Sequence, residues 1–195
     1  MAQGRRRFSS ADERTYLRSN AISAIRVPRS ATLATRALAV ADALATADQR
    51  RVQAASQQLL DAFCELLRIR PLRVEVCGAR PCNHYGELHG LYTPASARQA
   101  PDRVQVWMRT ARRLQVVAFK TFLRTLLHEL CHHLDYEYLK LGRSFHTEGF
   151  YKRESSLVCA VLPRATESLR MDSLTELGDQ VPAAQGATTS HNRRL

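Results

Sequence analysis

The residues best suited to carry chemistry are two histidines and a glutamate in the segment His128-Glu129-Leu130-Cys131-His132. Positions i and i+4 of a helix lie on one face, about 5–6 Å apart, so both imidazoles could bind one metal ion. In the pattern His-Glu-x-x-His, a zinc ion lowers the pKa of a water molecule to about 7, and the glutamate accepts the proton. We therefore expect a Zn²⁺ site with His128 and His132 as ligands and Glu129 as general base.

The segment around this motif has the periodicity of a long helix. At about 100° per residue, the leucines between Leu123 and Leu134 form one face, and His128 and His132 lie on the opposite face. We expect the helix to begin between residues 113 and 121 and to continue to about residue 141, before Gly142. The leucine face would pack on the core, and the histidines would face a cleft.

The motif supplies two metal ligands, and a third ligand must come from another part of the chain. A catalytic zinc ion usually has three protein ligands and one water, whereas a structural zinc ion has four protein ligands. We favour His146, which precedes a helix expected over residues 148–162. Glu154, inside that helix, is the second candidate, and Glu148 and Asp135 are the remaining ones.

The order of these residues resembles the SprT-like zinc metallopeptidases. The resemblance rests on His128-Glu129-x-x-His132 followed by His146-Thr-Glu-Gly-Phe150, and it covers roughly residues 50–165. It implies a zincin-like fold, a third zinc ligand at His146 and cleavage of peptide bonds. The Spartan branch of that family cleaves proteins crosslinked to DNA, which the resemblance makes a candidate substrate class. Thr147 stands where the family usually has Gly, and no Cys-rich zinc ribbon follows.

The elements that must position the motif are a helix and three strands upstream of it. Apolar residues repeat every three or four positions from residue 52 to residue 67, and Pro71 closes this helix. Residues 72–78 and 103–109 alternate in polarity as strands do, and residues 86–92 are a further candidate strand. The sequence therefore predicts an α+β protein with a zincin-like fold. A small three-stranded sheet would pack against the active-site helix and flanking helices.

Three segments differ in composition. Residues 1–30 are rich in Arg, Ser and Ala, and we expect a disordered basic N-terminal segment there. Residues 31–170 would form the metallopeptidase domain, beginning with an Ala-rich helix over 31–48. Residues 171–195 are expected to be a disordered C-terminal tail.

Charge and cysteine content suggest the surroundings and partners. No run of 18 apolar residues occurs, so we expect no membrane span, and no signal peptide is recognisable. Five mostly unclustered cysteines favour a reducing compartment, so we expect a cytoplasmic protein. The expected partner is a protein or peptide substrate, and the net charge of +11 is compatible with contact to nucleic acid.

A second hypothesis belongs to another class of protein. The chain would be a zinc-stabilised, non-catalytic binding module with nucleic acid as its candidate partner. Such a module needs a fourth protein ligand to close the metal site, and Glu154 and Asp135 are the candidates for it.

Overall fold

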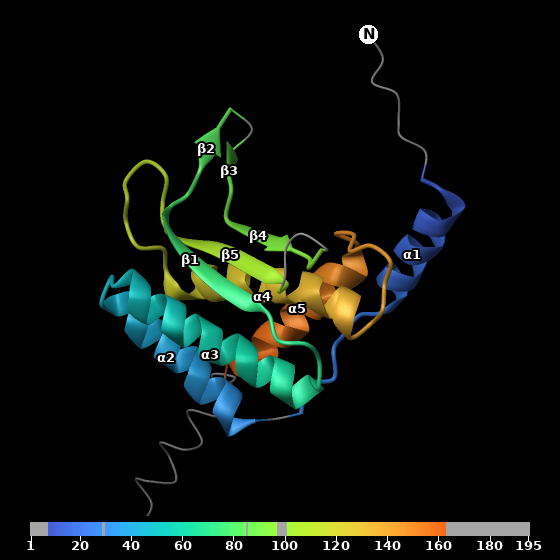
Figure 1. The fold of residues 1–195 in the computed structure, drawn as a ribbon, viewed down its shortest axis with the longest axis horizontal. Helices are drawn as coiled ribbons and strands as arrows, with labels where there is room; N and C mark the ends of the chain where they lie inside the picture. Colours follow the sequence, from blue (N-terminus) through green and yellow to red (C-terminus); the bar gives the residue numbers. More distant parts are fainter. Residues whose placement is uncertain (1–7, 29, 85, 97–100, 163–195) are drawn as a thin grey trace, which may run out of the picture. The chain divides into compact units, whose positions relative to one another are not determined.

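The computed structural model describes residues 8–28, 30–84, 86–96 and 101–162, all within the compact unit Met1–Leu162 (Figure 1). The helices of this part are α1 Ser10–Ala21, α2 Ala31–Ala45, α3 Gln49–Leu67, α4 Phe119–Glu137 and α5 Glu148–Val161. Its strands are β1 Arg73–Ala79, β2 Cys82–Asn83, β3 Gly86–Glu87, β4 Gly90–Thr93 and β5 Arg103–Arg109. Over these residues, no helix combines the length and the apolar character that a membrane crossing requires.

The main sheet has three strands in the order β1-β5-β4, with β1 parallel and β4 antiparallel to β5. Alternate side chains of β1 and β5 are fully buried, as in a sheet with one covered face. The helices α2 to α5 are gathered on that side of the sheet (Figure 1). The buried strand residues are Val74, Val76, Val104, Val106 and Met108. The expected α+β class with a small three-stranded sheet is therefore confirmed.

The strand predicted over residues 86–92 has the wrong bounds, because the structure divides this segment between two sheets. Gly86 and Glu87 pair with Cys82 and Asn83 in a separate two-stranded hairpin, and only Gly90–Thr93 joins the main sheet. Gly86 has φ of +128°, a backbone conformation that interrupts a regular strand. The edge strand next to α4 is consequently shorter than we expected.

The outer edge of β1 is covered by glutamine side chains from α3. Gln57 accepts a hydrogen bond from the Val74 N–H and donates one to the Leu72 carbonyl. Gln53 accepts from the Val76 N–H, and Gln49, one turn earlier, donates to the carbonyl of the same residue. These bonds satisfy backbone groups that an edge strand would otherwise expose.

The expectation of a disordered segment over residues 1–30 is wrong for residues 8–28. Helix α1 begins after Ser9, whose side chain accepts a hydrogen bond from the Asp12 N–H. Ser19 and Ile25 are buried against the rest of the unit. The folded unit thus begins before residue 31, while residues 1–7, residue 29 and the tail expected over 171–195 lie outside the described residues.

A buried ion pair joins α1, α4 and α5. The Asp135 carboxylate of α4 accepts a hydrogen bond of 2.9 Å from Arg153 of α5, and both side chains are fully buried. Arg153 also donates to the backbone carbonyls of Ser19 and Ile22 at the end of α1, each at 2.6 Å. A cation is favoured there because the carbonyl end of a helix is partly negative.

We predict that Arg153→Met lowers the free energy of unfolding by about 3–5 kcal/mol, because it leaves Asp135 charged and buried without its partner. Arg51→Met is the matched control. Arg51 makes only an exposed, 3.8 Å ion pair, so its loss should cost less than about 1 kcal/mol. Urea unfolding of both variants measures the difference, and equal losses would contradict the prediction.

Candidate metal centre

The structure brings His128, His132 and His146 together at the surface of α4. The Nε2 atom of His146 lies 3.0 Å from the Nε2 atom of His128 and 3.1 Å from that of His132. The first two residues are partly buried on α4, and His146 is exposed in the loop between α4 and α5. Within the described residues this is the one group of His, Cys, Asp or Glu side chains arranged to bind a metal ion.

The other ring nitrogens of the two α4 histidines are engaged as hydrogen-bond donors. The Nδ1 atom of His128 lies 2.9 Å from a carboxylate oxygen of Glu154. The Nδ1 atom of His132 lies 2.7 Å from the hydroxyl of Ser144, and that hydroxyl donates its only proton to Asp135. Both Nδ1 atoms therefore carry protons, and in the neutral form of such a ring the Nε2 atom presents its lone pair to the centre of the cluster.

A metal ion fits this arrangement of donors. One proton on the Nε2 atom of His146 could satisfy only one of its two neighbours, whereas a cation between the rings would satisfy all three lone pairs. Metal–nitrogen bonds of about 2.0–2.1 Å separate two nitrogens by about 3.3 Å around a tetrahedral ion, close to the spacing found here. Burial, together with the neighbouring imidazoles, lowers the pKa of His132 to about 3. Burial also lowers the pKa of His146. Both residues are therefore neutral ligands near pH 7.

The other candidate ligands have different partners. Glu154 binds the outer nitrogen of His128 and the guanidinium of Arg124. Burial acts to raise the pKa of Glu154, but these two partners outweigh it and hold that pKa below its usual value. Asp135 binds Ser144 and Arg153, and Glu148 forms an exposed ion pair with Lys152. Glu154 therefore positions the imidazole of His128, and Asp135 positions that of His132 through Ser144.

Glu129 lies beside the cluster at the free edge of β4. The residue is 6% exposed, and burial raises the pKa of its carboxyl group to about 7 even though His128 and a backbone hydrogen bond from Tyr92 act to lower it. A β-carbon at Gly90 would lie 2.5–2.9 Å from three atoms of the Glu129 side chain. Gly90 is therefore needed for Glu129 to occupy this position.

A buried polar network fixes β4 against α4. The Tyr92 hydroxyl lies 3.0 Å from Asp102 and 3.3 Å from the Nδ1 atom of His133. His133 is fully buried, and its Nε2 atom lies 2.8 Å from the carbonyl of Arg70. This network holds the strand in place beside Glu129.

Helix α1 supports the loop that carries His146. Arg18 donates to the carbonyl of Leu139, and Asp12 pairs with Arg143 at 3.2 Å. At the end of the loop, Ser19 lies 3.3 Å from the Thr147 hydroxyl, which also caps α5. Sequence reasoning missed this support, and it missed Ser144, because neither has a recognisable pattern near the motif.

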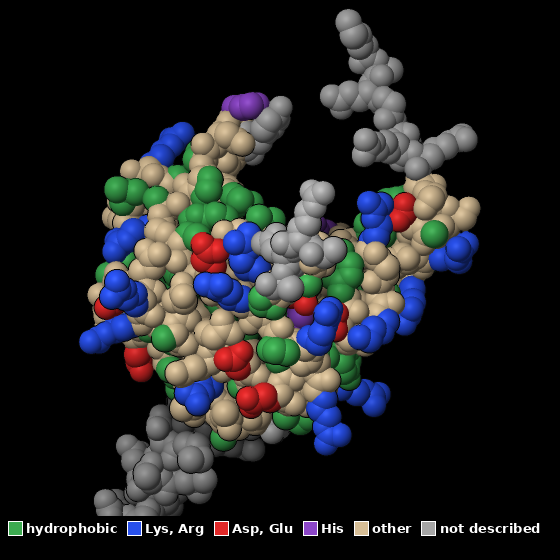
Figure 2. Space-filling model, viewed as in Figure 1, with side chains coloured by type: hydrophobic (Ala, Val, Ile, Leu, Met, Phe, Trp, Pro, Cys, Tyr) green, Lys and Arg blue, Asp and Glu red, His purple; other side chains and the backbone are tan. Residues whose placement is uncertain are grey.

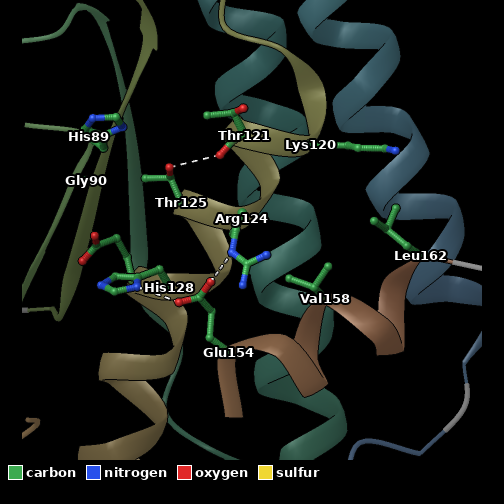
Figure 3. A pocket seen from close by; sticks show the side chains of 11 residues that line it. His89, Gly90, Lys120, Thr121, Arg124, Thr125, His128, Glu154, Val158 and Leu162 are labelled. Atoms are coloured by element: carbon green, nitrogen blue, oxygen red, sulfur yellow. Dashed lines mark hydrogen bonds and ion pairs between the residues drawn. The ribbon is translucent and has the colours of Figure 1, made fainter. Parts of the chain in front are cut away.

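Two cavities meet at the histidine cluster and share Gly90, His128 and Glu129 as lining residues. The smaller, of about 290 Å³, extends along β4 past Tyr92 and also contacts His146. The larger, of about 660 Å³, crosses the first half of α4 (Figure 3). The cluster thus lies on the floor of an open cleft.

Comparison of the chain with protein-family models, with curated proteins and with solved structures finds no match.

We predict that the protein binds one Zn²⁺ per chain and that His146→Ala weakens this binding by at least about 100-fold. The basis is that loss of a hydrogen bond to a ligand alone typically costs 10–100-fold, and this variant removes a ligand itself. His84→Ala, in the exposed turn between β2 and β3, is the matched control and should bind as the unaltered protein does. Competition with a chelating dye measures both affinities, and equal values would exclude His146 as a ligand.

Proposed function

We propose that this protein is a zinc-dependent metallopeptidase with a zincin-like active site, in which Glu129 is the general base. The observation that carries the proposal is the convergence of three imidazole Nε2 atoms beside a buried glutamate in an open cleft. His128, His132 and His146 would hold the ion. When bound, a zinc ion would supply an activated water and polarise the substrate carbonyl.

Zinc is favoured by the chemistry of the donors. Imidazole suits zinc well, and three neutral nitrogen ligands with an open fourth position are typical of catalytic zinc. Each α4 ligand also has an oxygen acceptor on its outer nitrogen, Glu154 for His128 and Ser144 for His132. Such acceptors fix the tautomer and the orientation of a ligand ring.

Glu129 carries out both proton transfers in the proposed reaction. The raised pKa of Glu129, about 7, suits a group that accepts a proton near neutral pH and then releases it. Its carboxylate accepts the proton of the attacking water and donates it to the amine that leaves as the peptide bond breaks. Gly90 and the backbone of Tyr92 keep that carboxylate in position.

A peptide substrate is supported by the open edge of β4. The Trp107 N–H donates to the carbonyl of His89, so by antiparallel alternation Leu91 also faces β5. The backbone groups of Gly90 and Tyr92 therefore face away from β5. The Tyr92 N–H meets Glu129, and the rest of this edge is available to pair with an extended peptide.

The proposal agrees with the resemblance to SprT-like metallopeptidases. Contact with nucleic acid stays a separate prediction from the net charge of +11. On the face drawn in Figure 2, Lys and Arg side chains are scattered, and acidic side chains lie among them. A nucleic-acid surface usually gathers its positive charge in one patch or stripe.

We predict that Glu129→Gln keeps zinc affinity unchanged and lowers kcat on a peptide substrate about 1,000-fold or more, because general base catalysis contributes 10²–10⁴-fold. Glu148→Gln is the matched control, since Glu148 is exposed and paired with Lys152. Hydrolysis of a fluorescence-quenched peptide library by the zinc-loaded protein measures the loss. Hydrolysis by Glu129→Gln at the unaltered rate would exclude the mechanism.

We also predict that Gly90→Ala lowers kcat by about 10- to 100-fold, because the new methyl group displaces Glu129. Zinc affinity should not change, because the new methyl group meets Glu129, which is not a proposed ligand. Gly78→Ala is the matched control in β1, where a β-carbon meets nothing closer than 3.9 Å. The two variants are compared by peptide hydrolysis and zinc titration, and equal kcat values would contradict the prediction.

A further inference from the structure

The larger cavity is a groove across the polar face of α4. Figure 3 shows Thr121, Arg124 and Thr125 of α4 along its floor. His89 and Gly90 lie on one side of this floor, and Val158 and Leu162 of α5 lie on the other. The groove leads from His128 and Glu129 to Lys120, at the beginning of α4.

The position of the groove determines which substrate residues would enter it. A peptide that pairs antiparallel with β4, the commoner arrangement, runs from Thr93 towards Gly90. The residues before the cleaved bond then lie along Leu91 and Tyr92 in the smaller cavity. The residues after it pass His89 and enter the groove.

The charge at the far end of the groove is positive. Near the histidines, Glu154 neutralises Arg124 through an ion pair of 2.6 Å. Lys120 is exposed and forms no ion pair within the part of the chain that the structure describes. Helix α4 also begins here without an acidic residue in its first turn, so the positive end of its dipole adds to the charge of Lys120.

The walls of the groove suit the stem of a side chain that carries such a charge. Val158 and Leu162 provide apolar surface along one side, and the ammonium of Lys120 lies at the exposed end. A glutamate side chain has methylene groups for the apolar wall and a carboxylate for the cation. A lysine side chain would meet Lys120 and the α4 N-terminus as like charges.

We propose that this groove binds acidic side chains of the substrate on the C-terminal side of the cleaved bond, and that Lys120 determines this preference. The proposal rests on the proposed peptidase function and specifies its class of substrate: proteins or peptides with acidic residues after the cleavage site.

The test uses the zinc-loaded protein and four fluorescence-quenched peptides that differ only in the residue after the cleaved bond: Glu, Gln, Leu or Lys. We expect kcat/KM for the Glu peptide to exceed that for the Gln and Leu peptides about threefold and that for the Lys peptide about tenfold. These factors are of the size expected for a partly exposed charge pair. The differences should shrink as salt is added, because salt screens exposed charges.

The decisive comparison is the charge reversal Lys120→Glu. It should invert the Glu-to-Lys ratio of kcat/KM and leave zinc affinity unchanged. Lys140→Glu, at the other end of α4, is the matched control and should leave the ratio as it was. Zinc affinity measured on each variant shows that it is folded.

The outcomes separate the two proposals. If peptides are cleaved but the four have equal kcat/KM, or the Leu peptide is cleaved best, the groove proposal is overturned and the peptidase function stands. An unchanged ratio in Lys120→Glu also overturns the role of Lys120. If the zinc-loaded protein cleaves none of the peptides and nothing in a broad peptide library, the peptidase function fails, and the groove proposal fails with it.

Discussion

The buried ion pair between Asp135 and Arg153 is the interaction on which the candidate metal centre depends. Asp135 orients His132 through the Ser144 hydroxyl, and Arg153 anchors the end of α1. The next residue of α5, Glu154, orients His128. Burying two charges is costly unless their hydrogen-bonding groups are satisfied. The side-chain nitrogen and oxygen atoms of this pair all have hydrogen-bond partners, except the Nε atom of Arg153. The bonds hold the imidazole rings of the histidine cluster in a fixed geometry.

The local part of the site could be predicted from the sequence, and the long-range part could not. His128, Glu129 and His132 follow from the spacing of one helix, because a helix places i and i+4 side by side whatever surrounds it. The sequence favoured His146 over Glu154 because it precedes the next predicted helix, and the resemblance to a known family implied the same ligand. The role of Ser144 depends on how a ten-residue loop folds back on α4, and no periodicity describes a loop.

Helix α1 explains why the sequence did not predict where the folded unit begins. Its sequence has no apolar stripe, and of its twelve residues only Ser19 is buried. The helix is held by polar contacts, chiefly from Arg153 to its carbonyls, so hydrophobic patterning does not reveal it. The strands, in contrast, alternate because one face of the sheet is covered, and β1 and β5 lie close to where the sequence placed them. The two edges of that sheet also differ. Glutamine side chains of α3 form hydrogen bonds to the backbone at the edge of β1, whereas the edge of β4 faces the cleft.

The contacts of α1 have a consequence for the order in which the protein becomes functional. Arg153 and Ser19 are 134 positions apart, and the other contacts of α1 with the His146 loop and α5 span similar lengths. During synthesis the first helix must wait for almost the whole domain to leave the ribosome before its partners exist. Contacts between distant residues are also slow to form, because a long loop must close first. The metal centre is therefore completed late, after the sheet and α3 have been able to pair.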